Sequence, residues 1–242
     1  MIVNYTEKGW EIVTQRAHGM LAGMLASYWH QSVRSQRWFE TILAISAHDD
    51  ARIEPGEHHL LTEQGGPIDF RMSAYDHEHC IRTMEASPSK SRYIALLSSM
   101  HLAFVYGQLA IGVPEGVKFM QEQAALRECW RKELGISQYQ AECDYRLLEW
   151  CDALSLLICK RECQPEARAI EISKGPNGQR HQLIQSPTGT LHISPWPFCK
   201  PAFDLPVESR LLHQLCFRDN KEFSSAFHEA PVILTIWRFS RY

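Results

Sequence analysis

QRAHGMLAGMLASYWHQ, residues 15–31, is the stretch that decides the expected fold. Its apolar residues recur every three to four positions, which is the spacing of an amphipathic helix with one buried face. His18 lies on that apolar face. Thr14 comes just before the stretch and is a residue type that commonly caps the N-terminus of a helix. We therefore expect a core helix here that carries an inward-facing histidine.

Four further stretches downstream have the same helical spacing, and most begin or end at residues that cap or interrupt helices. They are residues 35–48, a segment that begins after Pro88, a segment from about residue 115 that stops before Gly135, and residues 137–163. Upstream of the first helix, apolar residues flank the turn-prone Glu7-Lys8-Gly9 and predict a short β hairpin.

The last third of the chain has a different pattern. β-branched and aromatic residues form short runs separated by glycine, proline and asparagine, which is typical of strands joined by turns. The predicted strands are residues 167–172, 182–185, 191–193 and 232–239. The fold class that we expect is mainly α, with a short N-terminal hairpin and a β-rich C-terminal subdomain. We place a helical domain at residues 1–164 and a β-rich cap packed on it at residues 165–242.

The composition excludes several classes of protein. The 242 residues are 45% hydrophobic and carry a formal net charge of −3, which argues against a broad nucleic-acid-binding surface. No apolar run is long enough to span a membrane, and MIVNYTEKGW at the start lacks the order of a signal peptide. We therefore expect a cytoplasmic protein without nucleic-acid or membrane partners. The eight cysteines form no CxxC motif and are expected to be reduced, although Cys159 and Cys163 are spaced as a redox pair could be.

Four predicted helices each present a potential metal ligand on or at the end of an apolar face. These ligands are His18, His48 with Asp49, His101, and Asp152. Imidazole nitrogen and carboxylate oxygen bind divalent ions, and a buried carboxylate needs a cation or donor beside it. A lone buried histidine is more often a hydrogen-bonded core residue, and Asp152 could instead pair with Arg146 or Lys160. As an ordered set, however, the residues predict a metal site.

The order His, then adjacent His-Asp, then a distant Asp resembles the HD-domain superfamily of metal-dependent phosphohydrolases. That resemblance implies an HD-domain-like helical bundle in which His18, His48, Asp49 and Asp152 hold a divalent metal. It also implies that His101 is the extra histidine of members with two metals. Its companion would be His58, His59, His77 or His79.

Several segments along the whole chain also resemble, more narrowly, an uncharacterised bacterial family of unknown function. They are the opening MIV, Gln15-Arg16-Ala17-His18, His48-Asp49-Asp50, Pro67-Ile68-Asp69-Phe70, Ser99-Met100-His101 and Asp152-Ala153-Leu154-Ser155-Leu156. This second resemblance implies no activity.

The superfamily resemblance implies a hydrolase of a small, anionic, phosphate-containing substrate, with water activated by manganese, iron, magnesium, zinc or nickel. In that reaction Asp49 or Asp50 would orient the water as a base, and His101 would be a second ligand or an acid for the leaving group. The candidates to clamp the phosphate are Arg52, Arg71 and Arg92.

Two other functions stay open for the same residues. A di-iron oxygenase similar to inositol oxygenase would use this ligand set with iron, and a non-catalytic binding or structural module would keep the fold without turnover. A homodimer is also possible. We further expect the proline- and glycine-rich loop at residues 50–73 to border the pocket and to contribute His58 or His59. The pair His77 and His79 has i, i+2 spacing and is expected to face solvent.

Overall fold

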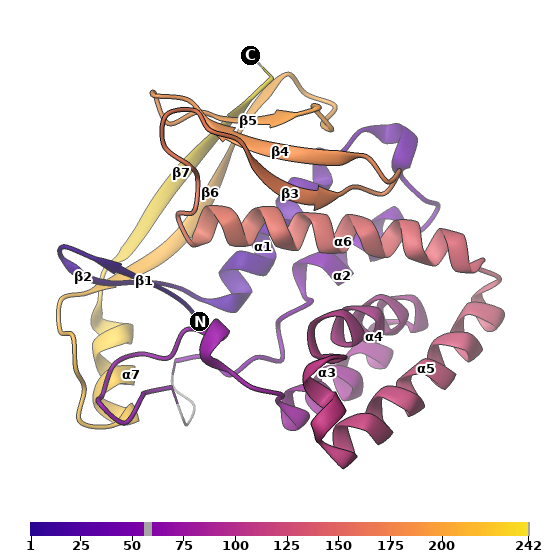
Figure 1. Ribbon diagram of the computed structural model, residues 1–242, viewed down its shortest axis with the longest axis horizontal. Helices are drawn as coiled ribbons and strands as arrows, with labels where there is room; N and C mark the ends of the chain where they lie inside the picture. The colour runs from indigo at the N-terminus through magenta and orange to yellow at the C-terminus, as the bar shows by residue number, and fades with distance from the viewer. Residues whose placement is uncertain (56–59, 242) are drawn as a thin grey trace.

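The computed structural model describes residues 1–55 and 60–241. Its helices, drawn in Figure 1, are α1 (Gln15–Ser27), α2 (Trp38–Ser46), α3 (His77–Lys90), α4 (Arg92–Tyr106), α5 (Pro114–Leu134), α6 (Gln138–Cys159) and α7 (Asn220–Glu229). Its strands are β1 (Ile2–Thr6), β2 (Gly9–Val13), β3 (Ile170–Lys174), β4 (Arg180–Gln185), β5 (Leu191–Ser194), β6 (Ala202–Leu212) and β7 (Val232–Ser240). Short 3-10 helices cover Gln31–Val33, Phe70–Met72 and Leu109–Gly112.

The expectation of a mainly α fold is wrong. The described residues build one seven-stranded sheet in the order β1-β2-β6-β7-β5-β4-β3, and about 48% of the chain is helical and 21% strand. The sheet is mixed, because β5 and β7 run parallel while the other neighbours are antiparallel. Helices and a largely antiparallel sheet that occupy separate layers make this an α+β fold.

The sheet joins the two ends of the chain. The N-terminal hairpin is confirmed, with Ile2 opposite Val13, but β2 also pairs with β6, where Trp10 lies opposite Leu212. The expected domain boundary at residues 164 and 165 lies between α6 and β3, and the sheet contains strands from both sides of it. The hairpin and the C-terminal strands therefore belong to one layer.

The helical layer lies against one face of this sheet (Figure 1). The core joins α1, α2, α4 and α6 to the inner side of the sheet, where alternate residues of β6 are buried. These inner residues are Phe203, Leu205 and Val207. No helix in the described part of the chain is both long and apolar enough to cross a membrane.

The helix α1 positions the functional residues, because it contacts α2, α6 and β6 at once. As predicted, it starts after Thr14, whose hydroxyl accepts a hydrogen bond from the backbone N–H of Ala17. Gly19 and Gly23 face α2: a Cβ atom on Gly19 would lie 2.5 Å from the carbonyl oxygen of Ser46, and one on Gly23 would overlap its hydroxyl. Glycine at these positions lets the two helices approach closely, and this approach brings the end of α2 to α1.

Candidate metal centre

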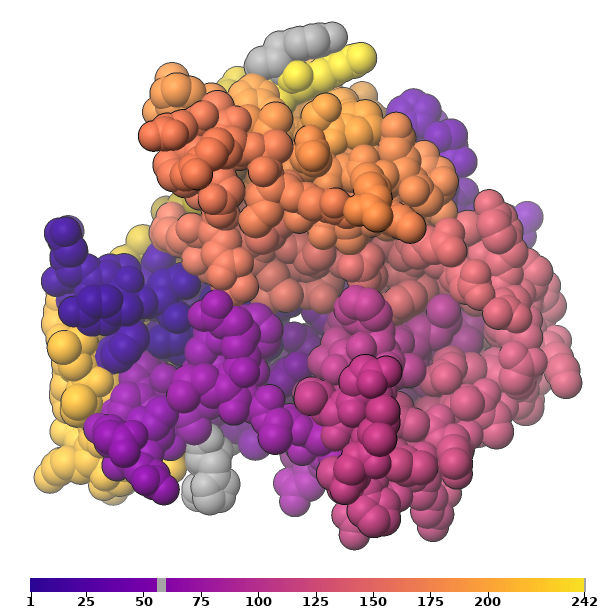
Figure 2. All heavy atoms as spheres, viewed as in Figure 1, coloured from indigo at the N-terminus to yellow at the C-terminus, as the bar shows by residue number. Residues whose placement is uncertain are grey.

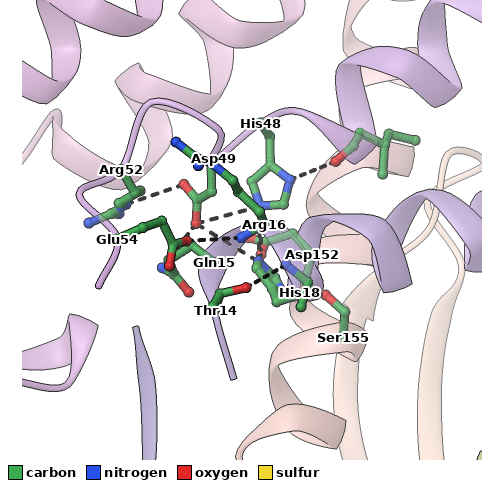
Figure 3. Close-up of polar contacts among 12 residues, drawn as sticks. Thr14, Gln15, Arg16, His18, His48, Asp49, Arg52, Glu54, Asp152 and Ser155 are labelled. Atoms are coloured by element: carbon green, nitrogen blue, oxygen red, sulfur yellow. Dashed lines mark hydrogen bonds and ion pairs between the residues drawn. The ribbon is translucent and has the colours of Figure 1, made fainter. Parts of the chain in front are cut away.

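Four side chains from three segments that are distant in sequence meet between α1, the end of α2 and α6 (Figure 3). The Nε2 atoms of His18 and His48 are 3.1 Å apart, and they lie 3.2 and 3.3 Å from Oδ1 of Asp152. Oδ2 of Asp49 lies 3.9 and 3.8 Å from the same two nitrogens. Ligands that share an ion at about 2.1 Å are roughly 3.0–3.5 Å from one another. The predicted convergence is therefore present, with Asp49 slightly outside ideal spacing.

Hydrogen bonds on the outer ring nitrogens fix the tautomers of both histidines. His48 Nδ1 lies 2.7 Å from the carbonyl oxygen of Ile45, which can only accept, so Nδ1 carries the proton. The hydroxyl of Ser155 donates to the carbonyl oxygen of Asp152 at 2.9 Å, so at 2.7 Å it accepts from Nδ1–H of His18. In the neutral form of each ring, the Nε2 lone pair consequently points into the cluster, which is the orientation of metal-binding histidines.

The two carboxylates of the cluster favour positive charge on or between the imidazoles. Burial alone would lower the pKa of His48, but Asp49 and Asp152 outweigh burial and raise it to about 9. Burial would likewise raise the pKa of Asp152, yet the hydrogen bonds and charges of the two imidazoles hold it well below its usual value. Two facing ring nitrogens beside two carboxylates need positive charge among them, which a proton on His48 supplies in the metal-free protein and a bound cation can replace. The donor set therefore fits a divalent ion.

A second group of potential ligands shares residues with the first. Ligand atoms of His48, Asp49 and His101 all lie within 4.8 Å of one another. His101 reaches the group from α4, and burial together with nearby His48 lowers its pKa to about 4. A neutral imidazole is the form that binds metals. The structure thus brings His101 to the centre, as the sequence predicted.

Asp49 also contacts two residues on its outer side. Its Oδ2 accepts a hydrogen bond from Gln15 Nε2 at 3.1 Å, and its Oδ1 lies 3.3 Å from Nε of Arg52. The guanidinium carbon of Arg52 lies 5.6 Å from the centroid of the Tyr106 ring, and the Arg52 side chain is only 14% exposed. Its two terminal nitrogens have no hydrogen-bond partner among the described residues. Asp49 therefore orients the guanidinium of Arg52, and its terminal N–H groups remain available as hydrogen-bond donors.

Unpaired buried polar atoms surround the cluster. Among the described residues, those near the centre are Gln15 Oε1, Glu54 Oε2, His79 Nδ1, Arg82 Nη2, His101 Nδ1, Tyr106 Oη and Tyr145 Oη. A buried polar atom without a partner costs about 1–3 kcal/mol, so a concentration of them indicates a place where a ligand or water binds. Figure 2 shows the surface hollowed where the segment before α3 meets α4 and α6.

The prediction that His77 and His79 face solvent is wrong for His79, which is 1% exposed. Asp76 caps α3, and this start directs His79, Thr83 and Ser87 along one inward face. The four-residue spacing of these residues is present in the sequence. Because two of them carry polar hydroxyls, however, the pattern does not resemble a buried helix face. His79 lies beside Tyr106, with ring centroids 5.8 Å apart.

Several predicted site residues lie elsewhere. Asp50 is half exposed and pairs with Lys90 at 3.8 Å, so its carboxylate turns away from the cluster. Arg71 pairs with Asp69 and Glu162, and Arg92 pairs with Glu133. His58 and His59 lie outside the described residues. Within the loop, Arg52 and Glu54 lie beside the cluster (Figure 3), and of these two only Arg52 was expected there from the sequence.

Comparison with known proteins identifies a family but no activity. A sequence model of a family described as "Protein of unknown function (DUF3891)" matches residues 1–214. No curated protein and no solved structure matches the chain, and nothing in these comparisons supports membership of the HD-domain superfamily. The match covers most of the chain, including every residue of the metal centre, so the protein belongs to the DUF3891 family of unknown function.

Proposed function

We propose that this protein is a divalent-metal-dependent hydrolase of a small phosphate-containing substrate. The observation that carries the proposal is the pair of buried imidazoles whose outer nitrogens are occupied and whose Nε2 atoms meet Asp152 at 3.2 and 3.3 Å. In the metal-free protein a proton on Nε2 of His48, whose pKa is raised to about 9, satisfies this contact. A divalent ion can replace that proton, because the outer nitrogens of both rings are occupied and both Nε2 atoms face Asp152.

Four residues would hold the ion, namely His18, His48, Asp49 and Asp152. His101 would be a ligand of a second ion, which the group with His48 and Asp49 supports. When bound, a divalent ion lowers the pKa of coordinated water and neutralises charge on a phosphoryl oxygen. Asp50 has no role in the proposal because its carboxylate lies beside Lys90.

Arg52 supports the assignment of an anionic substrate. Its Nε contacts Asp49 and its guanidinium carbon lies 5.6 Å from the centroid of the Tyr106 ring, while its terminal nitrogens have no partner among the described residues. A planar guanidinium with two free donors matches two oxygens of a phosphoryl group. Beside it, the hydroxyl of Tyr106 is a further buried donor without a partner. These residues would bind and orient the phosphoryl group.

The test is a substrate screen on purified protein, with phosphomonoesters and phosphodiesters and with each candidate metal added in turn. Asp152→Asn should abolish both metal binding and turnover. The matched control is Asp144→Asn on the same helix, because Asp144 is also a buried carboxylate but pairs with Tyr93 and Gln140. The control should retain both properties.

Equal turnover in Asp152→Asn and wild type would contradict the proposal. Metal binding without hydrolysis of any phosphoester would also contradict it. If iron were the bound metal, oxygen consumption with small polyols would then point to the oxygenase alternative.

A further inference from the structure

One edge of β7 is open along most of its length. The opposite edge pairs with β6 through all nine residues, whereas β5 meets the open edge only where Leu191 lies opposite Phe239. Figure 1 shows β5 beside only the C-terminal end of β7. In residues 1–55 and 60–241, no backbone hydrogen bond joins the open edge of residues 232–237 to another segment. This edge therefore presents a row of unpaired N–H and C=O groups.

The same stretch exposes large aliphatic side chains on both faces. They are Val232 (51% exposed), Ile233 (37%), Leu234 (57%) and Ile236 (54%). Edge strands that stay unpaired usually carry charged residues, prolines or bulges that prevent association. Residues 232–237 contain no charge and no proline, and their register against β6 has no bulge. None of these protections is present.

We propose that β7 pairs antiparallel with β7 of a second copy of this chain, so that the two sheets become continuous across a two-fold axis. A two-fold contact requires a surface that is complementary to itself, and an uncharged strand paired antiparallel with its own copy meets that requirement. The pairing would satisfy the free backbone groups and cover the aliphatic side chains of both copies together.

Charges at the two ends of the strand favour this antiparallel arrangement. Glu229 ends α7, just before β7 begins, and Arg238 lies near the other end of β7, where it also contacts Asp204 at 3.5 Å. Antiparallel pairing brings Glu229 of one copy toward Arg238 of the other. Parallel pairing would place like charges side by side. A second copy of the chain therefore carries charges complementary to those at the two ends of β7.

The experiment is light scattering after gel filtration, with the full chain at concentrations up to about 100 μM, where even micromolar association is populated. Wild type should have a mass near twice 27.9 kDa. Leu234→Lys places like charges face to face across the axis and should give a monomer, as should Ile236→Lys. The matched control is Ile111→Lys, which changes an equally exposed aliphatic residue, 66% exposed, far from β7 in the chain, and should stay dimeric.

Circular dichroism and thermal melting check that the variants fold, which their exposed positions predict. Amide hydrogen exchange gives a second readout, because residues 232–237 should be protected in the dimer and lose that protection in Leu234→Lys. A wild type that stays monomeric would overturn the proposal. So would a dimer that persists in both β7 variants, since the interface would then lie elsewhere.

Discussion

Ser155→Ala tests whether a hydroxyl on α6 sets the tautomer of His18. Both residues are fully buried, and the wild-type hydroxyl accepts the Nδ1–H of His18 at 2.7 Å. Without this acceptor, the imidazole either keeps a buried unpaired N–H, at a cost of about 1–3 kcal/mol, or moves its proton to Nε2. The second outcome removes the lone pair that faces the cluster. Loss of such a supporting hydrogen bond typically lowers metal affinity about 10- to 100-fold.

The assay is a competition titration of manganese or zinc against a chelating dye, together with thermal melts with and without metal. The variant should bind metal about 10- to 100-fold more weakly than wild type, and metal should stabilise it less. Ser87→Ala is the control, because Ser87 is also buried in a helix but its hydroxyl donates only to the carbonyl oxygen of Thr83. Equal metal affinity in Ser155→Ala and wild type would refute the role of Ser155.

Two further predictions concern stability. Arg161 holds the pKa of Glu11 below its usual value, so the pair stabilises the fold above about pH 4.5 and this contribution is lost as the pH falls through the lowered pKa. Glu11→Gln should therefore lower the free energy of unfolding by about 1 kcal/mol at pH 7. The effect is small because Arg161 is 45% exposed and solvent screens the pair. The melting curves of variant and wild type should converge in acid. Gly19→Ala should lower the free energy of unfolding by about 1–3 kcal/mol, because the added Cβ meets the backbone of Ser46. The control Gly66→Ala, whose added Cβ has space, should leave the free energy of unfolding nearly unchanged in denaturant titrations.

The helices α1, α2, α4, α5 and α6 and the convergence of the candidate ligands could be predicted because both depend on local patterns, whereas α3 and α7 were not predicted. Apolar spacing predicted α1 and α6, and the predicted cap Thr14 is confirmed. The candidate ligands could be identified because a histidine or aspartate interrupts an otherwise apolar stripe. The burial of His79 was missed because its stripe contains hydroxyl residues, which have the hydropathy of a solvent-facing surface.

The sheet could not be predicted because its pairing is long-range. In β6 the inner residues alternate with Asp204, Pro206 and Glu208, and the proline conceals the strand pattern. Once β6 is missed, nothing in the local sequence connects the N-terminal hairpin with β7. Ser155 and Glu54 were also missed, because only the folded contacts show that Ser155 contacts His18 and that Glu54 is buried beside the backbone of Arg16.

Anomalous diffraction from crystals grown with manganese or zinc tests the metal centre most directly. An anomalous peak is expected about 2.0–2.2 Å from Nε2 of His18, Nε2 of His48 and Oδ1 of Asp152. The peak should be absent from crystals of Asp152→Asn grown under the same conditions. Wild-type crystals with no peak between the two imidazoles, or with equal peaks in both proteins, would contradict the central claim.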